Sequence, residues 1–171
     1  MRNRRYTKIK YNAKTGVYIA YQQGQGWVNE CTIKCGEMPA PKFLVALRNL
    51  REHVIALCEL PKDYKDRITV TSVSLNYGGQ METMGATITA QMELLNSNCP
   101  LNLNTPNKPC EPYNADQEWD DKTCLTDECV SAINYLEAAA DEYLQGVRAQ
   151  IGLFDSLSPE PPARNEEKKA S

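Results

Sequence analysis

A single histidine is all that the 171-residue sequence offers for imidazole chemistry, and the short motifs of several large enzyme classes are missing. There is no GxxxxGK[ST] phosphate loop, no GxGxxG dinucleotide motif, no GxSxG nucleophile turn and no HExxH zinc motif. The histidine, His53, falls on a predicted helix and has no recognisable catalytic partner. We therefore expect a protein that is not an enzyme and that uses no cofactor.

A long hydrophobic run is also missing, since no stretch reaches the roughly 18 apolar residues that a membrane-spanning helix needs. The basic beginning, MRNRRYTKIKYN, is not followed by the apolar core of a secretory signal. These absences predict a cytoplasmic protein without membrane contact.

Seven cysteines are present, yet no two of them are spaced as CxxC. An odd number of cysteines in a reducing compartment argues against a disulfide framework, so we expect free thiols. Structural zinc sites usually show closely paired ligands. Because the sequence has no such pair of cysteines, we expect a protein without a bound metal.

Charge is unevenly distributed along the chain, although the net charge is only −3. Residues 1–51 contain ten basic and two acidic residues, whereas residues 52–171 contain nine basic and twenty acidic residues. A basic third that also carries aromatic residues is compatible with binding of single-stranded nucleic acid, and equally with solvated strand and helix surfaces. The candidate nucleic-acid-binding residues are Arg4, Arg5, Lys8, Lys10, Tyr18 and Trp27.

Apolar and polar residues alternate over residues 5–11, 17–22 and 27–34, and turns that contain glycine separate the three segments. This period of two predicts a meander of three strands. The residues expected on its buried face are Thr7, Ile9, Tyr11, Val17, Ile19, Tyr21, Trp27, Cys31 and Ile33.

Residues 39–60 change to a helical period, and Pro61 ends the segment. The apolar stripe of this predicted helix is Phe43, Leu47, Leu50, Val54 and Leu57. Two further strands are predicted over residues 67–77 and 83–92. In the first, the apolar phase slips between Val70 and Val73, which indicates a β-bulge. In the second, strict alternation predicts one packed and one wet face, which favours an antiparallel sheet.

Residues 96–125 are dense in Asn, Pro and acidic residues and are predicted to form a long loop that lines a pocket or wraps over the sheet. The loop contains four closely spaced acidic residues, Asp116, Glu118, Asp120 and Asp121. They lack the pattern of a calcium-binding loop, so we favour a solvated acidic loop over a cation site.

Thr126 is a predicted N-cap, and a second helical stripe follows it. This stripe comprises Val130, Ile133, Leu136, Ala140, Tyr143 and Val147. The segments together predict an α+β fold, with an antiparallel sheet of about five strands in the order βββ-α-ββ-long loop-α and two helices packed on one face. Residues 1–147 would form a single domain, and the proline-rich, charged residues 155–171 are expected to be disordered.

Between domain and tail lies a separate segment, residues 148–154, that contains the pentapeptide QIGLF, Gln150–Phe154. Its first interpretation is structural, because Ile151 and Phe154 continue the stripe of the second helix and could form its last turn. Against this, Gly146 and Gly152 each weaken a helix by about 1 kcal/mol relative to alanine. A Leu-Phe pair at the edge of the foldable part needs a partner to cover it.

The second interpretation is docking. The pentapeptide resembles the clamp-binding peptide of bacterial replication and repair proteins, in which Gln, an aliphatic residue, a variable residue, Leu and Phe follow one another. The resemblance implies that Gln150 hydrogen-bonds at the rim of the pocket of the DNA sliding clamp and that Ile151 packs beside it. It further implies that Leu153 and Phe154 fill the apolar subsites.

A wider resemblance covers roughly residues 63–154. The order ITVTSVSL, GATITAQMEL, LNLNTP, acidic helix and QIGLF is similar to small proteins without an assigned activity from tailed bacteriophages and related mobile elements. It implies an accessory role in DNA replication, recombination or host takeover inside a bacterial cell. Two alternatives stay open: a single-stranded nucleic-acid-binding module, and an anti-defence protein that sequesters a small ligand under the 96–125 loop.

Overall fold

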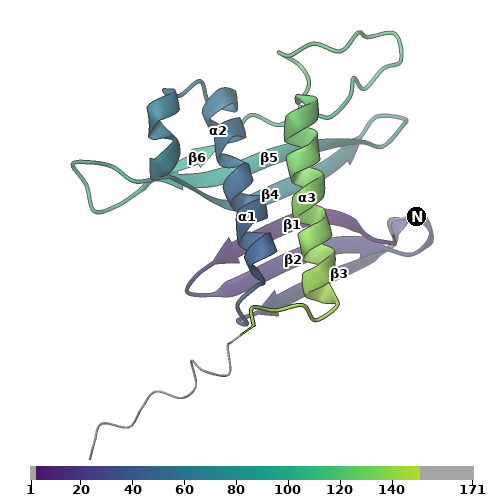
Figure 1. The fold of residues 1–171 in the computed structure, drawn as a ribbon. Coiled ribbons are helices and arrows are strands. Elements are labelled where there is room, and N and C mark those ends of the chain that lie inside the picture. Colours follow the sequence, from purple (N-terminus) through teal and green to yellow (C-terminus); the bar gives the residue numbers. More distant parts are fainter. Residues whose placement is uncertain (1–2, 151–171) are drawn as a thin grey trace, which may run out of the picture.

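The computed structural model describes residues 3–150 of the chain. Seven antiparallel strands form one sheet, and two helices lie side by side over one of its faces (Figure 1). The strands are β1 (Arg5–Asn12), β2 (Gly16–Gln23), β3 (Asn29–Cys35), β4 (Ile68–Gly78), β5 (Thr83–Met92), β6 (Leu101–Asn104) and β7 (Lys108–Pro109). Their order is β3-β2-β1-β4-β5-β6, and β7 pairs with the first half of β5.

The helices are α1 (Pro41–Asn49), α2 (Arg51–Leu57) and α3 (Asp127–Leu144), with short 3-10 helices η1 (Gln25–Trp27) and η2 (Lys62–Arg67). The predicted α+β class, an antiparallel sheet with two helices packed together on it, is therefore confirmed. None of the helices within residues 3–150 is long and apolar enough to cross a membrane.

The core lies between the helices and the sheet. A row of branched side chains crosses five strands, because the strand register places Ile33, Ile19, Ile9, Val73 and Ile88 opposite one another. Four of these residues are at most 1% exposed, and only Ile33 on the edge strand β3 is half-buried. Since successive strand residues point to opposite faces, the residues between them lie on the face that carries no helix.

Aromatic side chains join the two layers. The Phe43 ring of α1 lies 6.0 Å from the Tyr143 ring of α3 and 6.5 Å from the Tyr11 ring of β1. At the other end of α3, the Thr126 side chain accepts a hydrogen bond of 3.2 Å from the backbone N–H of Cys129, which confirms the predicted N-cap. α1 and α3 are thus fixed both to each other and to the sheet.

The first predicted helix is wrong as a single element. It divides at Leu50, whose N–H bonds to the Leu47 carbonyl three residues back and tightens the turn between α1 and α2. The apolar stripe survives this division, because Phe43, Leu47, Leu50 and Val54 are all buried.

Two details of the predicted meander are also wrong. A register shift between Tyr6 and Lys8 turns Tyr6, rather than Thr7, into the core, where it is 1% exposed opposite Tyr21. Trp27 belongs to η1 with a positive φ of 57°, so β3 begins only at Asn29. The bulge predicted in β4 is confirmed by a register shift between Val70 and Ser72.

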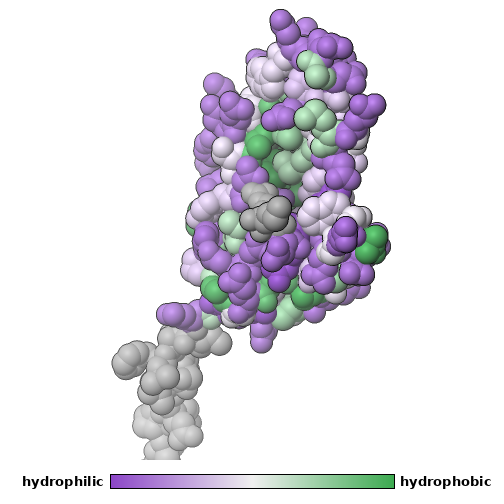
Figure 2. All heavy atoms as spheres, turned by 90° about the vertical axis from the view of Figure 1, so that its right-hand side faces the viewer, coloured by the Kyte–Doolittle hydropathy of each residue, from purple (hydrophilic) through white to green (hydrophobic). Residues whose placement is uncertain are grey.

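The region expected to be an unstructured loop over residues 96–125 contains both β6 and β7, which pair along β5. The sheet is therefore wider than the predicted five strands. At the side of the molecule on the right of Figure 1, the seam between the two layers is visible as a strip of hydrophobic surface between hydrophilic margins (Figure 2). Such apolar surface is normal where two layers meet at the edge of a small domain.

Candidate functional site

Helix α3 ends in a Schellman motif around Gly146. The N–H of Val147 donates to the Glu142 carbonyl at 3.0 Å, and the N–H of Gly146 donates to the Tyr143 carbonyl at 3.1 Å. Gly146 has a φ of +99°, a left-handed conformation that other residues adopt only at a cost. The predicted continuation of the helical stripe to Val147 is therefore wrong, and Val147 is 43% exposed. α3 thus ends at Leu144, before the pentapeptide begins.

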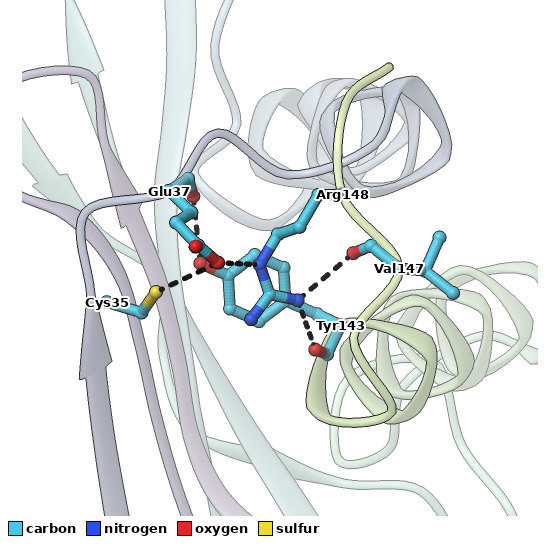
Figure 3. A network of polar contacts seen from close by, with 5 residues as sticks. All are labelled: Cys35, Glu37, Tyr143, Val147 and Arg148. Carbon is cyan, nitrogen blue, oxygen red and sulfur yellow. Dashed lines mark hydrogen bonds and ion pairs between the residues drawn. The ribbon is translucent and has the colours of Figure 1, made fainter. Parts of the chain in front are cut away.

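Arg148 fastens the chain just before the QIGLF segment (Figure 3). Its Nε donates to Oε2 of Glu37 at 2.6 Å, and its guanidinium carbon lies 3.6 Å from the centre of the Tyr143 ring. A second nitrogen of the same group donates to the backbone carbonyls of Tyr143 and Val147. Tyr143 completes the cluster, because its hydroxyl donates to the Glu37 carbonyl at 2.8 Å. The end of α3 is thus bonded to the segment between β3 and α1.

Backbone pairing extends this attachment by one residue. Arg148 forms an isolated antiparallel bridge with Pro39, and the N–H of Ala149 donates to the Met38 carbonyl at 3.1 Å. Gln150, the first residue of the pentapeptide, is exposed. The other candidate clamp-binding residues, Ile151, Leu153 and Phe154, lie outside the described residues, as does the tail 155–171.

The electrostatics of the attachment follow from its geometry. The hydrogen bond and the charge of Arg148 lower the pKa of the Glu37 carboxyl below its ordinary value, and a 3.7 Å contact from the Cys35 thiol acts in the same direction. Burial raises the pKa of Tyr143, so its hydroxyl remains a donor. The ion pair between Arg148 and Glu37 consequently depends on an ionised carboxylate, whereas the backbone contacts of the attachment do not.

The two N-terminal arginines predicted to contact nucleic acid are bound within the domain instead. Arg4 forms an ion pair with Asp141 of α3 at 3.1 Å and lies 5.5 Å from the Tyr21 ring centre. Arg5 forms an ion pair with Glu82 at 3.1 Å. Its guanidinium carbon also lies 3.8 Å and 5.7 Å from the ring centres of Tyr77 and Trp27. The two arginines line a pocket of about 330 Å³ whose other lining residues are Trp27, Tyr77, Met81, Glu82, Met84 and Glu137.

Lys8, Lys10 and Tyr18 are placed differently, on the sheet face without helices. The register sets Lys10 opposite Tyr18, and Tyr18 opposite Lys34 of β3. Lys34 was not among the residues predicted from the sequence, although the alternation of β3 indicated its position. Cys31, Ile33 and Cys35 pack against the core, so Lys34, between the last two, points to the opposite face.

Metal ligands and the single histidine were the remaining candidates for chemistry in the described part. Among residues 3–150, no three His, Cys, Asp or Glu side chains are grouped so that they could hold a metal ion.

The pKa of His53 is lowered, chiefly by burial, with Glu52 and Glu128 acting in the opposite direction. At the beginning of the predicted 96–125 loop, an open pocket of about 390 Å³ is lined by Thr69, Gln91 and Asn98, among other residues.

Comparisons with protein-family models, with curated proteins and with solved structures find no match. What the chain does is therefore inferred from its own residues.

Proposed function

We propose that this chain is a non-enzymatic accessory protein of a bacteriophage or mobile element that docks on the DNA sliding clamp of a bacterial cell. Gln150–Phe154 would be the docking peptide. The observation that supports this proposal is the break at Gly146, which directs residues 147–149 away from the axis of α3 and along residues 37–39. If the pentapeptide continued the helix, its apolar side chains would lie on the face of α3 that packs against the core and could not bind a partner.

The attachment through Arg148 favours binding for an energetic reason. Association costs free energy for each segment that must be ordered, and the chain leading to the pentapeptide is already held at Arg148 and Ala149. Gln150 is exposed and free to hydrogen-bond at the rim of a foreign pocket. The two apolar anchors, Leu153 and Phe154, follow within three and four residues.

The test uses the full-length chain and a purified bacterial sliding clamp immobilised on a biosensor. The double variant Leu153→Ala/Phe154→Ala removes both proposed anchors. Loss of even one hot-spot side chain costs about 2 kcal/mol or more, so we expect the Kd to rise by at least about thirtyfold.

The matched control is Met81→Ala/Leu95→Ala. It also removes two apolar side chains, and both are largely exposed, at 73% and 84%, far along the chain from the pentapeptide. We expect this control to bind like the unmodified chain. Equal retention of the unmodified chain and the Leu153→Ala/Phe154→Ala variant on the clamp would refute the proposal.

A further inference from the structure

The charges of this protein are separated between its two layers. The seven strands contain five basic residues and one acidic residue, Glu30, whereas α1, α2 and α3 together contain three basic and six acidic residues, five of the six in α3. Because α3 covers one face of the sheet, most of this negative charge lies on the helical side (Figure 1). The net charge of −3 therefore conceals a basic region on the opposite side.

Three lysines make up this basic region, hereafter the lysine face: Lys8 and Lys10 of β1 and Lys34 of β3. Lys10 and Lys34 are exposed, and the register places Tyr18 of β2 between them. The ammonium nitrogen of Lys34 lies 5.8 Å from the centre of the Tyr18 ring. Lys8 lies two residues along β1, opposite Ala20 and Ser74.

The lysines of this face are not neutralised within the described chain. Between residues 3 and 150, none of the three forms an ion pair with a carboxylate. Arg4 and Arg5, in contrast, are both paired. The lysine face thus retains three positive charges that an external anion could meet.

The same face continues across the rest of the sheet with uncharged polar groups. The row that begins with Lys34, Tyr18 and Lys10 passes the buried Ser72 and continues through Thr89 and Asn104, of which Asn104 is exposed. No carboxylate interrupts it, and the Thr89 hydroxyl bonds to the Asn104 amide oxygen at 2.9 Å. A ligand lying across the strands would meet cations and a ring first, and hydrogen-bonding groups next.

We propose that the lysine face binds single-stranded nucleic acid. The lysines would neutralise backbone phosphates, and the Tyr18 ring would stack on one base. A single strand is favoured over a duplex because the face is an open sheet surface from which no helix projects to enter a groove. It is favoured over an acidic peptide because an aromatic ring stands between the cations, and ring stacking needs a base. This proposal does not depend on the sliding clamp.

The experiment measures fluorescence anisotropy of a labelled 20-nucleotide single strand with the full-length chain at several salt concentrations. With three phosphates neutralised, the slope of log K against log salt is expected to be about −2. The variant Lys10→Gln/Lys34→Gln should lower the magnitude of this slope by about 1.4 and weaken binding about tenfold at low salt. The variant Tyr18→Leu should weaken binding at least about fivefold and leave the slope unchanged, because it removes stacking and no charge.

The matched control is Lys62→Gln/Lys122→Gln, which removes two exposed lysines outside the sheet. It should bind like the unmodified chain. The proposal is overturned if no binding occurs at about 50 mM salt, or if both lysine variants lose affinity equally. It is also overturned if a duplex of the same length or polyglutamate binds as tightly as the single strand.

Discussion

Replacement of Gly146 by alanine tests the structural basis of the proposed docking segment, because the two interpretations of the C-terminal region predict effects of opposite sign. If α3 continued into the pentapeptide, position 146 would be a helix interior, and Gly→Ala would stabilise the protein by about 1 kcal/mol. In the Schellman motif Gly146 has a φ of +99°, and a Cβ there is strained.

The magnitude follows from the conformation alone. The space around Gly146 is open, with no atom within 4 Å of an added Cβ, so the cost is backbone strain and not a clash. A left-handed conformation costs a non-glycine residue about 1–2 kcal/mol. With a urea m-value of about 2 kcal/mol per M for a domain of this size, the midpoint should fall by about 0.5–1 M.

Urea unfolding followed by circular dichroism measures this shift. Gly36→Ala is the matched control, since its added Cβ also meets no atom within 4 Å and the residue has no positive φ. We expect its midpoint to stay within about 0.3 M of the unmodified protein. A rise of the midpoint in Gly146→Ala would refute the helix end described here and would favour packing of QIGLF as a last helical turn.

Two further predictions concern titratable groups. Arg148→Gln should raise the pKa of Glu37 toward its ordinary value, as measured by NMR titration of the carboxyl, because Arg148 is the main cause of the lowered pKa. Since the folded pKa is lowered, the Glu37–Arg148 contact contributes to stability above the ordinary carboxyl pKa and is lost as the pH falls through the lowered one. An unchanged pKa in the variant would contradict this pairing. The exposed Cys99 should react rapidly with an aromatic disulfide reagent at pH 8, whereas Cys129, whose pKa burial raises to about 11, should react only after unfolding. Equal rates in the folded protein would show that Cys129 is accessible.

The sequence predicted the sheet well where local pattern and burial agree. The alternation in β2 and β5 and the bulge near Val70 were all visible, because β-branched residues on one face make the phase clear. The bulge at Tyr6 could not be predicted, because tyrosine and threonine both occur on either face of a strand. The shift of register therefore did not interrupt the alternation of apolar and polar residues. The division of the first helix at Leu50 had no local signal either, since leucine favours helices.

Strands β6 and β7 were missed for a related reason. Asn and Pro are unfavourable in strands, so LNLN and the residues around Pro109 indicate a loop by their own propensity. Their pairing with β5 is a tertiary effect, because the free edge of β5 provides the hydrogen-bonding partner. The Arg148–Glu37 pair joins residues 111 positions apart and could not be read from one sequence. Gly146, in contrast, carried a usable signal, because a glycine just after a helical stripe is the commonest helix end.

The docking segment and the lysine face are connected through β3. Lys34 lies near the end of this strand, and Glu37 and Pro39, which hold Arg148, follow it within a few residues. A chain held at the clamp by Gln150–Phe154 would therefore keep Lys34, at one side of the lysine face, close to the point of attachment. A sliding clamp surrounds DNA, so attachment there would raise the local concentration of nucleic acid at the lysine face, and two modest affinities would combine into a higher overall affinity. The distribution of charge would favour the same arrangement, because DNA would repel the acidic helix α3 and would approach the lysine face more readily.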